Sequence, residues 1–274
     1  MTDITPASRW RESLLRWTAP PPEVPPTPSS DGWRMHADRF RALNERPRAH
    51  DEPFLQFLAP WLTPGVTVLD VGAGGGRFAL PLAERGVRVV AVEPSPAMAA
   101  VLRETAEARG LAVDLVAERW PDAAAPTAPL VICANVAYDV ADLAPFVAAL
   151  DRAAERLVAL YLPLTHPVGH LAHLWRAFRG WQPPDGPTYL DAAAVVFELG
   201  IPCNVTLVPS YPTLTFADWD ALVAFYRHRL GMQPQPARDA ALRAALAPDV
   251  EERGGELVVR PRQRWAAVIW WDKG

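Results

Sequence analysis

Cysteine is scarce in this chain, with only two among 274 residues. Cys133 and Cys203 are far apart and form neither a CxxC pair nor part of a metal-ligand cluster. A disulfide scaffold is therefore excluded, and we expect two unpaired thiols in a reducing cytoplasm. A chain of this length that is 50% hydrophobic can bury a large core without such links. We expect no metal site.

Positive charge is also limited. Acidic residues outnumber basic ones, 31 to 27, and Lys273 is the only lysine. No basic field covers the whole chain, which argues against a nucleic-acid substrate. A local patch of arginines remains an open alternative.

Long hydrophobic runs are missing as well. The start of the chain, MTDITPASRW, has no apolar segment of the kind that a signal peptide needs. The longest apolar stretches, such as residues 130–136, are much shorter than the run of about 20 residues that crosses a bilayer. We therefore expect a cytoplasmic protein without a membrane partner. Nothing in the sequence indicates its oligomeric state.

Residues 1–50 differ in composition from the remainder and are interpreted as a helical and proline-rich cap. Thr5 and Pro6 are typical of a helix start, and Trp10, Leu14 and Trp17 share one helical face behind them. Six prolines within residues 20–28 exclude a helix there. A second amphipathic stretch covers about 33–43.

Residues 51–274 alternate between apolar strands and helices. Strands are predicted at 66–71, 87–92, 111–117, 130–134 and 157–162, then at 205–208 and 264–271. Strands that are apolar throughout and separated by helices indicate a doubly wound, mostly parallel α/β sheet. A helical insert is expected at 163–200, after the fifth strand, and further helices at 217–231 and 236–246.

The most informative segment is VLDVGAGGGR at residues 68–77. Its glycines lie between a strand and a helix, where they allow a sharp turn and a close approach to a ligand. The second strand ends at Glu93, whose carboxylate can accept hydrogen bonds from a ribose diol. Such a loop with a distant acid fits both NAD and S-adenosylmethionine, because both contain a ribose.

Three details favour S-adenosylmethionine. The third glycine of a dinucleotide GxGxxG motif would fall at Arg77. Asp70 would repel a pyrophosphate, but it would attract the ammonium and sulfonium groups of S-adenosylmethionine. The first strand of this domain also begins behind a helical segment, whereas dinucleotide domains more often begin at the strand.

At these residues the chain resembles the class I S-adenosylmethionine-dependent methyltransferases. The stretch VLDVGAGGGRFALPLAERGVRVVAVEPSPAM, residues 68–98, carries the first two motifs of that family. The resemblance implies a Rossmann-like sheet of seven strands, here with an N-terminal helical cap and the helical insert. It is clear over about 50–165 and only an outline elsewhere.

The resemblance also implies site residues. Asp70, with the backbone at Gly72 and Gly74, would hold the methionine end of the cofactor, and Glu93 would bind the ribose. An acid after the third strand often bonds the adenine amino group, and Glu118 stands there, although it could be a plain surface acid. The cofactor-binding set implied in this way is Asp70, Gly72, Ala73, Gly74, Glu93, Pro94, Ser95, Glu118, Arg119 and Asn135. Trp120 could stack on the adenine or could simply pack helix against sheet.

Methyl transfer needs alignment above all, and a base only when the acceptor is protonated. Tyr138 and Asp139 follow the fourth strand and His166 follows the fifth, so all three belong at the carboxyl edge of the sheet. Tyr138 and His166 are the tentative catalytic residues. His166 and His170 are spaced like metal ligands, but the sequence offers no obvious third ligand, and a structural role for His166 is the main alternative.

The acceptor is predicted to be a small molecule. The N/D-P-P-Y/F motif of amino and amide nitrogen methylation is missing after the fourth strand, where CANVAYDV stands instead. The two extra segments, 1–50 and 163–200, are expected to form the acceptor pocket. Their tryptophans could close over a substrate or could merely pack a cap onto the sheet. An RNA or protein methyltransferase, or a non-catalytic protein that binds S-adenosylmethionine, remains the alternative.

Overall fold

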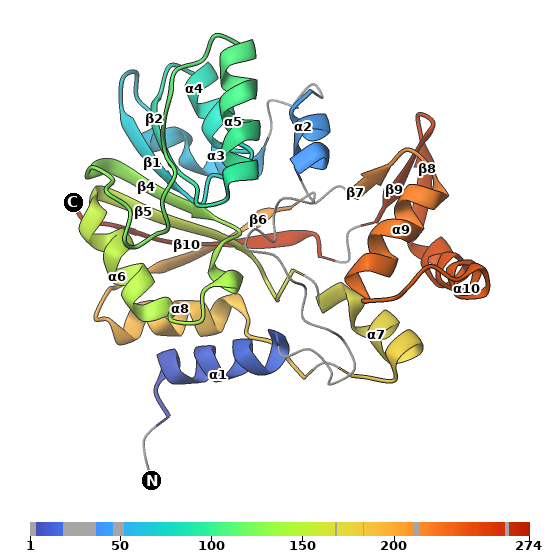
Figure 1. Cartoon of the computed structure of the whole chain (residues 1–274). Coiled ribbons are helices and arrows are strands. Elements are labelled where there is room, and N and C mark those ends of the chain that lie inside the picture. Colours follow the sequence, from blue (N-terminus) through green and yellow to red (C-terminus); the bar gives the residue numbers. More distant parts are fainter. Residues whose placement is uncertain are drawn as a thin grey trace.

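The computed structural model describes residues 4–18, 37–45, 52–167, 169–182, 184–210, 214–260 and 263–274. Its centre is a seven-stranded sheet in the order β3-β2-β1-β4-β5-β10-β6 (Figure 1). The strands are β1 Thr67–Val71, β2 Arg88–Val92, β3 Val113–Val116, β4 Ala128–Ala134, β5 Ala154–Pro163, β6 Asn204–Pro209 and β10 Trp265–Asp272. Neighbours pair in parallel except at β10, which is antiparallel to both β5 and β6. The mostly parallel, seven-stranded sheet predicted from the sequence is confirmed.

Helices cover both faces of this sheet (Figure 1). Side chains alternate along β1, so Leu69 faces the cluster with α6 and α8, whereas Val68 faces the cluster with α3, α4 and α5. These helices are α3 Pro53–Leu58, α4 Ala79–Glu84, α5 Pro96–Ala108, α6 Leu143–Ala153 and α8 Tyr189–Glu198. Short 3-10 turns occur at Ala59–Trp61, Ala137–Asp139, Gly169–Leu171 and Ala247–Asp249. Burial on both faces explains why the inner strands consist almost entirely of apolar residues.

Two helices precede this domain. Helix α1, Pro6–Thr18, packs on α6 and α8, and Trp10 is fully buried there with its Nε1 donating to the Val140 carbonyl at 2.8 Å. The helix expected behind Pro6 is therefore present, but it lies as an outer layer on one face. Helix α2, Ala37–Glu45, packs against α5 on the opposite side of the sheet (Figure 1). The proline-rich stretch 20–28 lies outside the described residues.

A smaller lobe projects from the sheet (Figure 1). It combines α7 Ala172–Arg179, α9 Trp219–Arg229 and α10 Pro236–Leu246 with a three-stranded sheet. That sheet, β7-β9-β8, consists of Leu214–Phe216, Glu256–Val259 and Val250–Arg253 and is antiparallel. The lobe has a hydrophobic cluster of its own, with Leu174, Leu222 and Leu242 at its centre. The insert expected at 163–200 is thus divided, since α7 joins the lobe while α8 covers the main sheet.

None of the helices in the described ranges has the length and apolar character needed to cross a bilayer.

Candidate functional site

A cavity of about 290 Å³ opens where β1, β2 and β4 end. The carboxyl ends of parallel strands meet at one edge, which is where open α/β sheets bind ligands. Its walls come from the glycine loop, the ends of these strands, the turn after β3 and helix α2. The lining residues are Phe40, Asp70, Val71, Gly72, Ala73, Gly74, Arg77, Phe78, Val92, Glu93, Pro94, Ser95, Met98, Arg119, Trp120, Ala134, Asn135, Val136, Asp139, Val140 and Phe146.

The glycine loop is fixed against the end of β2. The amides of Gly72 and Ala73 both donate to the Val92 carbonyl, at 2.8 and 3.1 Å. Gly72 has a φ of 77°, and a Cβ there would lie 2.3 Å from Val136 Cγ2. No side chain fits at Gly72, so the bare backbone forms this wall of the cavity.

Glu93 links the end of β2 to the loop. The side chain is buried, its Oε2 accepts the Gly74 amide and its Oε1 accepts the Ser95 amide, both at 2.8 Å. Ser95 in turn caps α5, since its Oγ accepts the amide of Met98 at 3.3 Å. A carboxylate accepts hydrogen bonds only, and at about four positions, which makes Glu93 chemically suited to ligand hydroxyls.

Asp70 is the most unusual group of the cavity. It is 1% exposed and its Oδ2 has no hydrogen-bond partner. The pKa of Asp70 is raised to about 7, first by burial and then by the nearby charge of Glu93, while a hydrogen bond from the Ala79 backbone opposes both. A buried carboxyl group with a free oxygen is suited to holding a cation.

Asn135, directly after β4, has a φ of 61° and is the only residue other than glycine with positive φ in the described ranges. Asparagine tolerates this conformation better than most residues, and such backbone outliers concentrate at functional sites. The backbone N–H of Asn135 donates to the backbone carbonyl of Tyr161 in β5 at 2.7 Å, and this hydrogen bond holds the turn at the cavity.

Most of the site residues predicted from the sequence are brought together here. The exception among the cofactor-binding set is Glu118, whose Oε2 accepts the Ala124 amide at 2.7 Å and which does not line the cavity. Trp120 does line it, and its Nε1 donates to the Phe146 carbonyl at 3.3 Å.

The two tentative catalytic residues lie elsewhere. The Tyr138 hydroxyl donates to the Pro163 carbonyl at 2.9 Å, its ring stacks on Trp10 with centroids 5.5 Å apart, and burial raises its pKa. The His166 ring lies 5.1 Å from the Trp17 ring and 5.4 Å from that of Tyr138, and burial lowers its pKa to about 4. Neither lines the cavity, and both belong to an aromatic cluster that joins α1 to the sheet.

The tryptophans expected to close over a substrate also have packing partners. Trp10 is fully buried beneath α1, and Trp175 packs against the core of the lobe. The ring of Trp175 contacts that of Trp181 edge-on at 5.4 Å. Trp33 lies outside the described residues.

Sequence reasoning missed several residues of the cavity. Phe40 reaches it from α2, and no sequence signal connects that helix with the glycine loop. Asp139, which the sequence places at the sheet edge together with Tyr138 and His166 as a candidate base, is the one of the three that lines the cavity. Its side chain is exposed at the cavity. Desolvation by the surrounding protein raises the pKa of the carboxyl group, and the charge of Arg229 on α9 lowers it by a smaller amount. In the described ranges no three His, Cys, Asp or Glu residues gather into a metal site.

Comparison with known proteins agrees with this geometry. Residues 68–158 match the family model of the methyltransferase domain. Ubiquinone biosynthesis O-methyltransferase from Methylobacterium sp. strain 4-46 is 37% identical over 92 residues, which are 33% of this chain and 37% of that protein. The 23S rRNA (uracil(1939)-C(5))-methyltransferase from Shewanella sp. strain ANA-3 is 41% identical over 76 residues, 24% of this chain and 16% of that protein. The chain therefore spans little more than a third of the length of the first relative and about a sixth of the second.

A solved structure extends the similarity to the fold. Magnesium protoporphyrin IX methyltransferase from Synechocystis PCC 6803, with bound SAH (S-adenosylhomocysteine), superposes with a TM-score of 0.51 at 19% identity. The superposition covers 64% of this chain and 89% of that one. The sheet described above is thus the sheet of a methyltransferase fold.

Proposed function

We propose that this chain, whose residues 68–158 match the model of the methyltransferase domain, is a class I S-adenosylmethionine-dependent methyltransferase that transfers the methyl group of S-adenosylmethionine to a small-molecule acceptor. The observation that carries the proposal is the unpaired, buried oxygen of Asp70 in the same cavity as the glycine loop and Glu93. This arrangement supplies a partner for a cation at one end and acceptors for a ribose at the other.

The residues of the cavity fit this cofactor. Asp70 would hold the ammonium of the methionine end, next to the loop wall at Gly72 where no side chain fits. Glu93 would accept the ribose hydroxyls, since its carboxylate lines the cavity at the end of β2. Trp120 and Met98 would contact the adenine, because both line the cavity and offer apolar surface to its ring.

S-adenosylmethionine, when bound, supplies a methyl group on a positively charged sulfur. The protein then has to align the acceptor, which can contribute about 7–11 kcal/mol to lowering a barrier. Asn135 and Asp139 line the cavity behind β4 and would face the acceptor. Asp139 would accept the proton of a hydroxyl acceptor, since its side chain is exposed at the cavity and desolvation by the surrounding protein raises the pKa of its carboxyl group.

Several observations favour a small acceptor over a macromolecular one. The ubiquinone-pathway relative is by its name an O-methyltransferase, and the formal net charge of this chain is −4. Helix α7 follows the carboxyl end of β5 and β7 follows that of β6, so the lobe begins at the edge that holds the cavity. An acceptor pocket between sheet edge and lobe would enclose a small molecule. We further propose a cytoplasmic location, which the two free cysteines favour.

Thermal unfolding with added ligands tests the proposal. S-adenosylmethionine or S-adenosylhomocysteine at 100 times its dissociation constant should stabilise the protein by about 2.7 kcal/mol, and NAD should have no effect. Glu93→Gln should lose most of this shift. Glu118→Gln is the matched control, because that carboxylate lies outside the cavity. A folded protein that shows no shift with either adenosyl ligand would contradict the proposal.

The acceptor class is tested separately. Transfer of a radiolabelled methyl group to a small-molecule extract, with no transfer to total RNA, is the expected result. Labelled RNA would instead favour the activity named for the rRNA relative.

A further inference from the structure

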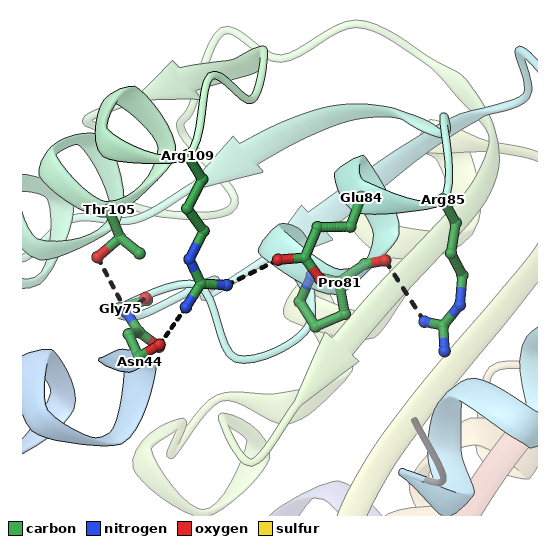
Figure 2. Close-up of polar contacts among 7 residues, drawn as sticks. All are labelled: Asn44, Gly75, Pro81, Glu84, Arg85, Thr105 and Arg109. Carbon is green, nitrogen blue, oxygen red and sulfur yellow. Dashed lines mark hydrogen bonds and ion pairs between the residues drawn. The ribbon is translucent and has the colours of Figure 1, made fainter. Parts of the chain in front are cut away.

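Helix α2 lies beside the glycine loop although some 30 residues separate the two in the sequence. Figure 2 shows Asn44, near the end of α2, pointing its side chain at the loop. Asn44 is 2% exposed, and its Nδ2 donates to the Gly75 carbonyl at 2.7 Å and to Thr105 Oγ1 of α5 at 3.3 Å. The side-chain amide of Asn44 is therefore buried against the side of the loop that faces away from Glu93 and toward α2.

A second contact holds the same residue from α5. The Arg109 guanidinium donates to the Asn44 carbonyl and to Glu84 Oε1 of α4, the latter at 2.7 Å (Figure 2). Arg109 thereby ties the end of α2 to the helix that leaves the glycine loop. Nearer the start of α2, Arg41 pairs with Glu104 of α5 at 3.0 Å on the surface.

The loop needs such support because it contains three successive glycines. Gly74 and Gly76 have φ values of 55° and 89°, and glycine loses more conformational freedom on ordering than any other residue. On the cavity side, Glu93 accepts the Gly74 amide. On the outer side, Asn44 donates to the next carbonyl, that of Gly75. Two neighbouring residues of the loop are therefore held from opposite sides.

Helix α2 also forms part of the cavity wall. Phe40, one turn before Asn44, lines the cavity, and a Cβ on Gly75 would come within 3.1 Å of Phe40 Cβ. The same helix thus contacts the loop through a hydrogen bond and closes one side of the cavity with an aromatic ring.

From these contacts we infer that Asn44 is a positioning residue of the cofactor site, so that docking of α2 and binding of the adenosyl cofactor stabilise each other. The inference rests on the proposed function. Asn44 holds the loop in the shape that leaves the Gly74 amide on Glu93, and the bound cofactor contacts both the loop and Phe40. Coupling of this kind is reciprocal, so a ligand that prefers the docked helix must also protect it.

Two variants and a control test the inference. Asn44→Asp keeps the side-chain size and removes the Nδ2 donor, and Asn44→Ala removes the group altogether. In both Asn44 variants the affinity for S-adenosylhomocysteine should decrease by about tenfold, which corresponds to the loss of one buried hydrogen bond. Calorimetric titration measures this affinity. Arg41→Ala removes the ion pair with Glu104 of α5 but leaves the hydrogen bond from Asn44 to the loop in place, so the affinity of this variant should stay within about twofold of wild type.

Hydrogen exchange separates positioning from simple loss of stability. In the wild type, S-adenosylhomocysteine should slow amide exchange both in the loop and in α2, and in the Asn44 variants the protection of α2 should disappear. Without ligand, the loop amides of the variants should already exchange faster than those of Arg41→Ala. Variants that are less stable but show an unchanged ligand-induced shift in Tm and unchanged protection would overturn the inference. Wild-type protein that does not bind S-adenosylhomocysteine would refute the proposed function, whereas equal binding by wild type and Asn44 variants would refute the coupling alone.

Discussion

The pKa of Asp70 leads to a prediction about proton release. Because the pKa is raised to about 7, much of this carboxyl group is protonated in the ligand-free protein near neutral pH. An ammonium group bound at its unpaired oxygen would favour the ionised form and lower the pKa. Cofactor binding should therefore expel a proton from Asp70. Asp70→Asn, which is isosteric and does not titrate, should abolish the effect.

The magnitude follows from the pKa. At pH 6.5 a carboxyl group with a pKa of about 7 is about three quarters protonated, so binding should release about 0.7 proton per molecule. Calorimetric titration at this pH in buffers of different ionisation enthalpy measures the number directly. 5′-Methylthioadenosine, which lacks the ammonium, should release much less. Zero release by the wild type, or equal release by Asp70→Asn, would refute the reasoning.

The same shift has a consequence for stability without ligand. Asp70 is ionised above pH 4 in the unfolded chain but only above about pH 7 in the folded one, so the folded state binds more protons in between. The contribution of Asp70 to the free energy of unfolding should then fall as pH rises from about 4 to 7, by at most about 4 kcal/mol. Asp70→Asn removes this term. The variant should be more stable than wild type at pH 8 while binding S-adenosylmethionine more weakly.

Three further predictions follow. Gly72→Ala combines a positive φ with a clash against Val136, so it should weaken cofactor binding and cost about 2–4 kcal/mol of stability. The control Gly86→Ala, at a φ of 75° in open space, should cost about 1 kcal/mol and leave cofactor binding unchanged. Similar losses of binding in both variants would contradict the clash. Asp139→Asn should lower kcat for a hydroxyl acceptor by about 10²–10⁴-fold and leave the affinity for S-adenosylhomocysteine intact, and unchanged turnover would rule out a proton-accepting role. Because the pKa of His166 is lowered to about 4, its contribution to the free energy of unfolding should fall from pH 6.5 to 4, opposite in direction to that of Asp70. The difference in free energy of unfolding between wild type and His166→Gln, taken from urea unfolding curves, should follow this pH dependence, and a difference that does not change with pH would exclude it.

The sheet could be predicted because its signal is local and repeated. Each inner strand is a short apolar run followed by a helix, and the predicted bounds differ from the observed ones by only a few residues. The lobe was harder, since its helices were predicted but its strands β7, β8 and β9 were not. Those strands are three or four residues long and half polar. The turn Gly254-Gly255, with φ values of 59° and 80°, was the available hairpin signal.

The site divides in the same way. Residues within or just after the glycine motif were predicted, because motif and cavity lie at the same chain positions. Phe40 and Asn44 depend on how α2 packs on α5, which no spacing in the sequence reveals. Tyr138 and His166 were expected at the correct edge of the sheet, but Trp10 and Trp17 draw their rings into the packing under α1 instead of toward the cavity.

The two ends of the cavity have different structural origins, and this bears on acceptor choice. The cofactor end is built from residues 68–98 and the strands beneath them, the part of the chain that matches the family model. The lobe has a separate hydrophobic core and leaves the sheet through two insertions, so its shape can change without disturbing the strands. The lobe still affects the site, because the charge of Arg229 on α9 lowers the pKa of Asp139. Arg229 itself is held in the lobe, where its guanidinium lies 4.7 Å from the Phe225 ring and its Nε is buried without a hydrogen-bond partner. On the proposed function, the lobe would set both which acceptor fits beside Asn135 and how readily Asp139 takes its proton, while the cofactor end stays the same.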